Sequence, residues 1–110
     1  MNIFEVLAEP TRRQILDLLR EHSRMVGDLV DILDITQPNV SKHLKVLREA
    51  GLVTVRREAQ WRRYELNPEP LAELEDWLAP YREHMEARFN RLDKLLDELQ
   101  QDNDEENNNE

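Results

Sequence analysis

The residues whose types and spacing most clearly suggest chemistry lie in the stretch TQPNVSKHLKVLREAGL, positions 36–52. Thr36 is a good N-terminal cap for a helix, and Pro38 is tolerated in a first turn. Apolar residues then recur at i, i+4 and i+7, the spacing of one helix face. They are Val40, Leu44 and Leu47. Because Gly51 favours the left-handed backbone that ends helices, the stretch predicts one capped helix with an apolar inner side.

The outer side of this helix is predicted to bind DNA. Side-chain amides can pair with adenine edges, lysine reaches guanine or phosphate, and hydroxyl or imidazole groups can donate to phosphate oxygens. The side chains with these capacities are Thr36, Gln37, Asn39, Ser41, Lys42, His43 and Lys45. Such groups near the start of a helix are typical of a recognition helix in the major groove. For Lys45 or Arg48 alone, simple solvation is the better interpretation; the ordered set favours DNA.

The segment that follows, residues 52–66, changes to the residue types of β-strands. A turn near residues 58–60 would make it a hairpin. Four arginines on this hairpin predict a basic wing lying along the DNA backbone or in the minor groove. They are Arg56, Arg57, Arg62 and Arg63.

The charge is distributed unevenly along the 110 residues. The formal net charge is -9, yet residues 36–66 hold seven Lys or Arg against three acids, and residues 101–110 hold five acids and no base. The local field decides where a polyanion can dock, so the bulk charge does not exclude DNA. Cysteine is absent, which excludes disulfides and thiolate metal ligands. No apolar run reaches the length of a membrane span or signal peptide, so the expected location is the cytoplasm.

The rest of the chain predicts helices. Residues 3–7 suggest a short first helix, Pro10 begins a second, and Gly27 is expected to cap a third whose inner face is Leu29, Ile32 and Leu33. A heptad-like stripe over residues 71–99 predicts one long helix, which Pro80 should kink or break. Residues 1–100 would form the DNA-binding and dimerisation domain. Residues 101–110 would be a disordered acidic tail.

The second half of that long helix has little of its own chain to cover it, although packing on its own domain is the simpler alternative. We expect it to bury its apolar residues against a second subunit, together with the first helix. The residues expected at this interface are Phe4, Leu7, Tyr81, Met85, Phe89, Leu92, Leu95, Leu96 and Leu99.

Two motifs, LAEPTRRQILDLL and ITQPNVSKHLKVLREAGLV, resemble the ArsR family of winged-helix bacterial repressors. The resemblance implies a mainly α fold with a small β-hairpin, a winged helix-turn-helix with a long C-terminal dimerisation helix. It also implies a homodimer bound to double-stranded DNA at an inverted-repeat operator. By the same resemblance, positions that face DNA in the family are Gln37, Asn39, Ser41, Lys42 and His43.

The chain departs from the family's metal-sensing members. The stretch RMVGDLVDI lacks the cysteine pair of one sensor type, and His84 stands alone where another type has an Asp, two His and a Glu. We therefore expect no metal and no cofactor. The predicted wing tip, Glu58-Ala59-Gln60, lacks the glycine common in the family, so a wider or bulged turn is expected.

Three functions are compatible with these observations to different degrees. The leading prediction is a dimeric repressor of its own or a neighbouring operon. The alternative is a protein-interaction module that retains the winged-helix fold with little DNA affinity. An enzyme is not expected, because the sequence has no glycine-rich phosphate loop, nucleophile elbow or metal-ligand cluster.

Overall fold

The computed structural model describes residues 1–108, with side-chain exposure to residue 103. The chain forms two compact units, Met1–Glu75 and a second that begins at Asp76. The elements are α1 (Ile3–Ala8), α2 (Pro10–Glu21), α3 (Val26–Leu33), α4 (Gln37–Glu49), β1 (Val53–Glu58), β2 (Trp61–Leu66), a 3-10 turn η1 (Glu69–Leu71) and α5 (Ala72–Asn108). This order is that of the predicted mainly α fold with a small hairpin.

Side chains supply hydrogen-bond partners for the backbone groups at both ends of α1. At its C-terminal end these side chains come from α2. The Asn2 side chain accepts from the Glu5 amide at 2.9 Å and caps the N-terminus. At the other end, Arg12 Nε donates to the Val6 carbonyl at 2.7 Å, and Arg13 Nη1 donates to the Leu7 carbonyl at 2.6 Å. These carbonyls have no partner within α1, so the arginines of α2 supply the donors that a further helical turn would have provided.

Two expectations for α3 are wrong. Gly27 does not cap the helix; it lies in its first turn, and Met25 is the N-cap. Ile32 is 51% exposed instead of buried, because the inner face is shared by Leu29, Val30 and Leu33. The helix ends at Asp34, whose left-handed backbone (φ 53°) lets its amide donate to the Val30 carbonyl.

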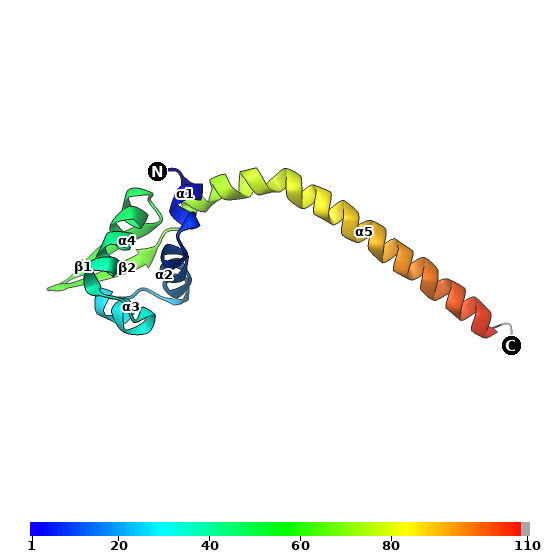
Figure 1. Cartoon of the computed structure of the whole chain (residues 1–110), viewed down its shortest axis with the longest axis horizontal. Coiled ribbons are helices and arrows are strands. Elements are labelled where there is room, and N and C mark those ends of the chain that lie inside the picture. The colour runs from blue at the N-terminus through cyan, green and yellow to red at the C-terminus, as the bar shows by residue number, and fades with distance from the viewer. Residues whose placement is uncertain (109–110) are drawn as a thin grey trace. The chain divides into compact units, whose positions relative to one another are not determined.

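The hairpin is regular, so the expected wide or bulged tip is also wrong. β1 and β2 pair antiparallel without a break from Val53↔Leu66 to Glu58↔Trp61, which leaves a two-residue turn. Ala59 adopts φ 55°, the left-handed conformation that glycine takes most easily. In Figure 1 the hairpin tip extends away from the helices of its unit.

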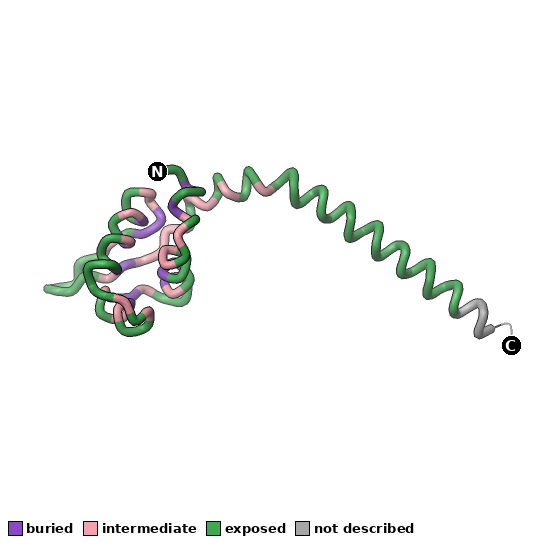
Figure 2. The backbone as a smooth tube through the Cα atoms, in the orientation of Figure 1, coloured by how far each residue is buried: buried purple, intermediate pink, exposed green. Residues whose placement is uncertain are grey.

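The core lies within the first unit (Figure 2). Its buried apolar side chains come from α1, α2, α3 and α4, from the hairpin and from Leu52 just before it. They are Ile3, Val6, Ile15, Leu16, Leu19, Leu29, Val40, Leu44, Leu47, Leu52, Val53 and Tyr64. The core therefore fixes α4 and the hairpin in one body.

The last helix is continuous through Pro80, so the predicted break is absent. It continues to Asn108, so residues 101–108, expected to be disordered, are helical; residues 109–110 lie outside the described residues. No glycine or proline follows Pro80, and the sequence thus offers no stop signal. No helix in the described part of the chain is apolar and long enough to cross a membrane.

Candidate nucleic-acid interface

Helix α4 exposes its polar side because its apolar side packs into the core. Thr36 Oγ1 accepts from the Asn39 amide at 3.4 Å and begins the helix, and Pro38 occupies its first turn, as predicted. Val40, Leu44 and Leu47 are at most 2% exposed. Gly51, at φ 78°, follows the last turn in the predicted left-handed conformation. Burial of the three apolar residues fixes the rotation of the helix about its axis.

The opposite side of α4 bears most of the predicted DNA-contacting residues. All of these side chains are exposed: Thr36, Gln37, Asn39, Ser41, Lys42 and Lys45. Two amides and a hydroxyl lie in the first half of the helix, and the two ammonium groups lie three residues apart. The face therefore combines hydrogen-bonding groups for base edges with cations for phosphates.

His43 differs from the other predicted contact residues. Its side chain is only partly exposed, and its Nδ1 atom is buried with no hydrogen-bond partner in the described structure. Burial lowers the pKa of His43, the positive charges of Arg12 and Lys42 lower it further, and Glu9 opposes them. His43 thus lies between α4 and the start of α2, and only the other edge of its ring is available to a ligand.

The four wing arginines fall on two different faces of the hairpin. Arg56 contacts Glu58 at 2.9 Å and Glu65 at 3.1 Å, while Arg63 contacts Glu58 at 3.4 Å. Arg57 and Arg62 oppose each other on the other face. In the described part of the chain, neither of these two makes an ion pair.

A connection that the sequence analysis missed joins the wing to the helices. Arg24, between α2 and α3, exchanges backbone hydrogen bonds with Tyr64 of β2. Its side chain is almost fully buried; Nε donates to the Leu18 carbonyl at 3.1 Å and Nη2 to Glu21 at 2.7 Å. A single extended residue has no periodicity, so no sequence pattern indicated this bridge.

Comparison with known proteins agrees with this geometry. Residues 9–55 match the model of a family described as bacterial regulatory protein, arsR family. The transcriptional repressor SdpR of Bacillus subtilis is 35% identical over 77 residues, which cover 70% of this chain and 86% of SdpR. The chain belongs to the ArsR family. It is a DNA-binding transcriptional regulator with a winged helix-turn-helix fold.

Other relatives of this ArsR-family regulator include a longer protein and solved structures. The arsenical resistance operon repressor of Escherichia coli is 42% identical over 69 residues; the match covers 62% of this chain and 59% of that repressor. A solved ArsR family transcriptional regulator is 32% identical with a TM-score of 0.66, covering 76% of this chain and 87% of the other. A homodimeric winged helix-turn-helix DNA-binding domain from Mycobacterium bovis is 30% identical, with a TM-score of 0.58 and coverage of 72% and 73%.

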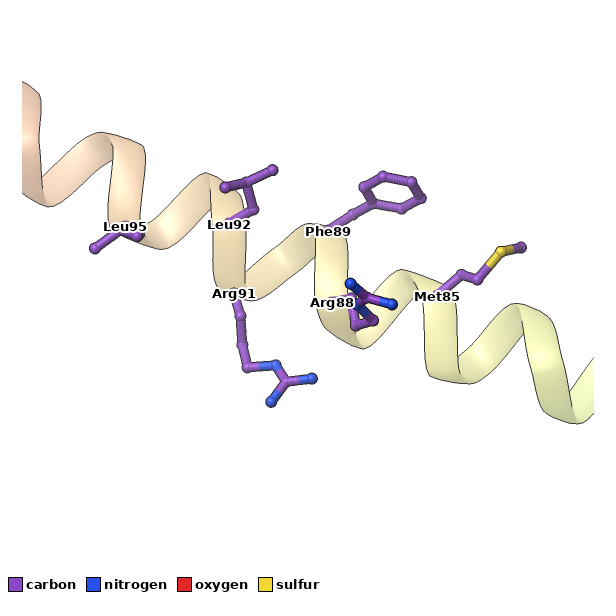
Figure 3. A pocket seen from close by; sticks show the side chains of 6 residues that line it. All are labelled: Met85, Arg88, Phe89, Arg91, Leu92 and Leu95. Carbon is purple, nitrogen blue, oxygen red and sulfur yellow. The ribbon is translucent and has the colours of Figure 1, made fainter.

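The second unit of the regulator is a helix with an uncovered apolar side. Every residue from 79 to 103 is exposed (Figure 2). The large apolar side chains among them are each 50–62% exposed: Tyr81, Met85, Phe89, Leu92, Leu95, Leu96 and Leu99. Figure 3 shows Met85, Phe89 and Leu92 extending from one side of α5 while Arg91 extends from the other. On α1, Phe4 is 39% exposed and Leu7 packs partly against the core.

Proposed function

We propose that this chain is a homodimeric repressor that blocks transcription of its own or a neighbouring operon by occupying an inverted-repeat operator. One observation carries the proposal: α4 buries Val40, Leu44 and Leu47. It exposes Asn39, Lys42 and Lys45 on the opposite side and Gln37 in its first turn. The interaction-module alternative does not require this combination. A repressor of chromosomal genes acts in the cytoplasm, where we place it.

Different residues of α4 are proposed to contact different parts of the DNA. Gln37 and Asn39 are proposed to read adenine edges, since an amide can donate and accept together. Lys42 and Lys45 bind phosphate or guanine, and the hydroxyls of Thr36 and Ser41 donate to the backbone. His43 is proposed as a minor contact through its accessible ring edge.

The test measures binding of the protein to the DNA directly upstream of its own coding sequence. Lys42→Ala and Lys45→Ala should weaken binding without unfolding the protein, because both side chains are exposed and alanine favours helix. Lys94→Ala, which removes the third lysine of the chain from α5, is the matched control. Equal binding by all three variants and the wild type would exclude α4 as the recognition helix.

Dimerisation is proposed to cover the apolar side of α5 together with Phe4 and Leu7 of α1. A monomeric helix with this much exposed apolar surface is unusual, because large exposed patches mark protein interfaces. Leu92→Asp should therefore dissociate the protein in sedimentation experiments. Ile32→Asp is the control, since Ile32 and Leu92 are both 51% exposed. If Leu92→Asp stays dimeric, the interface lies elsewhere.

A further inference from the structure

We propose that Arg57 and Arg62 together clamp one DNA backbone phosphate, while Arg56 and Arg63 are held by glutamates of the hairpin and contribute little to binding. This inference rests on the proposed function, because it specifies how the wing of a DNA-binding protein contacts its ligand. It divides the four arginines of the wing into two pairs with different roles.

The register of the hairpin places two arginine pairs on adjacent rungs. Arg56 lies directly opposite Arg63, and Arg57 lies directly opposite Arg62. Side chains that are directly opposite in an antiparallel pair lie about 5 Å apart at Cβ, where like charges repel each other. Because successive residues of a strand point to opposite sides, the two rungs face opposite sides of the hairpin. Each side of the wing thus carries one pair of facing guanidinium groups.

On one side, the repulsion is relieved by carboxylates of the hairpin itself. Glu58 forms ion pairs with both Arg56 (2.9 Å) and Arg63 (3.4 Å), and Glu65 forms one with Arg56 at 3.1 Å. Two arginines and two glutamates make this side neutral. We call it the paired face; its residues are Thr54, Arg56, Glu58, Trp61, Arg63 and Glu65.

On the other side, the hairpin supplies no carboxylate. We call this the open face; its residues are Val53, Val55, Arg57, Arg62, Tyr64 and Leu66. Asp28 of α3 lines a hollow together with Arg62, but its carboxylate accepts from the Met25 amide at 3.2 Å and makes no ion pair within the described residues. The whole net charge of the hairpin, +2, therefore lies on Arg57 and Arg62.

The comparison of the two rungs indicates which ligand suits the open face. On the paired face, the oxygens of Glu58 bridge two opposed guanidinium groups. A phosphate has the same capacity, since its oxygens accept from several N–H donors and pair well with arginine. A backbone phosphate of duplex DNA would thus bridge Arg57 and Arg62 and offset their repulsion, as Glu58 does between Arg56 and Arg63.

The experiment compares four alanine variants that differ only in the face they alter. Binding to a fluorescein-labelled duplex of mixed sequence, about 30 base pairs long, is measured by anisotropy at about 50 to 300 mM salt. Each phosphate contact contributes about 0.9 to the slope of log Kd against log salt, about an eightfold change in affinity at 0.1 M salt. Because both arginines bind the same phosphate, Arg57→Ala and Arg62→Ala should each weaken binding by up to this amount per protomer bound. Arg56→Ala and Arg63→Ala, the matched controls, should change affinity less than about twofold.

A fifth variant tests the role assigned to Glu58. Glu58→Gln removes one negative charge and releases Arg63 from its carboxylate partner, so it should steepen the salt slope and tighten binding to the same duplex. Thermal melting of each variant establishes that it is folded. If the wild type binds DNA and all four alanine variants weaken binding equally, the two-face assignment is wrong while the proposed function stands. If the wild type shows no salt-dependent binding to any duplex, both fail.

Discussion

Arg24 and Tyr64 exchange a pair of backbone hydrogen bonds, with N···O distances of 3.1 and 2.8 Å. The chain between α2 and α3 is thereby joined to the second strand of the wing. Since Tyr64 is buried in the core that also holds α4, the bridge ties the hairpin to the body that orients α4. The wing and α4 are thus positioned by one set of contacts.

The side chain of Arg24 should matter for stability although it is charged. We predict that Arg24→Ala lowers the free energy of unfolding by about 1–3 kcal/mol, because the Leu18 carbonyl loses its donor and a buried aliphatic stem is removed. The ion pair with Glu21 adds little, since Glu21 is 59% exposed. Urea denaturation measures the loss. Arg20→Ala, an exposed arginine in the last turn of α2, should change stability by less than about 0.5 kcal/mol.

The two glycines should respond to alanine with opposite signs. Gly51 has φ 78°, so Gly51→Ala should cost about 1–2 kcal/mol; the new Cβ would meet Pro70 only at an ordinary 3.5 Å, and the loss therefore reports backbone strain. Gly27 lies in α3 with nothing within 4 Å of the position that an added Cβ would take, so Gly27→Ala should stabilise by about 0.5–1 kcal/mol. Melting curves of both variants measure these changes in stability. Two changes of the same sign would contradict the backbone assignments.

His43 should make stability depend on pH. Its pKa is lowered in the folded protein by burial and by Arg12 and Lys42, with Glu9 opposing, so the unfolded chain binds the proton more readily. Stability is therefore complete above the ordinary value of 6.5 and falls as the pH drops below it. Denaturation midpoints between pH 7.5 and about 5 should show this fall, and His43→Gln should reduce it.

The control for this experiment is His84→Gln on α5, an exposed histidine of the second unit. It should retain the fall, because His43 is still present. A His43→Gln protein whose stability depends on pH as steeply as that of the wild type would show that other groups cause the effect.

Removal of residues 101–110 should affect long-range electrostatics more than assembly. The segment contains five acids and no apolar residue, so its deletion changes the net charge from -9 to -4 and removes nothing that could bury in an interface. We predict unchanged sedimentation and melting temperature. Affinity for mixed-sequence DNA should rise at about 50 mM salt and match the full chain at about 300 mM, where charges are screened. Loss of the dimer on truncation would mean that the segment takes part in assembly.

The polar side of α4 could be predicted from the sequence because helical spacing alone determines which side is buried. Once Val40, Leu44 and Leu47 are assigned to the core, the exposed positions of Asn39, Lys42 and Lys45 follow. The same argument was too simple for α3. In this short helix, spacing alone does not show which apolar residues are buried, and Ile32 is exposed although the spacing predicts that it faces the core.

The division of the wing could not be predicted in this way. Four arginines in a short segment look equivalent until the register shows which of them share a side with Glu58 and Glu65. That register depends on the turn, where Ala59 takes a conformation that sequence patterns assign to glycine. Tertiary contacts such as the Arg24–Tyr64 bridge likewise depend on segments distant in sequence.

The exposed apolar side of α5 has a consequence for the cellular concentration at which the protein can occupy DNA. A helix of 37 residues is about 55 Å long, and from residue 79 to residue 103 it buries no side chain of its own. If a second copy supplies the missing cover, operator occupancy at low abundance rises with the square of the protomer concentration. DNA occupancy would then fall steeply when the protein is diluted and rise steeply when more of it is made. Abundance itself would serve as the signal.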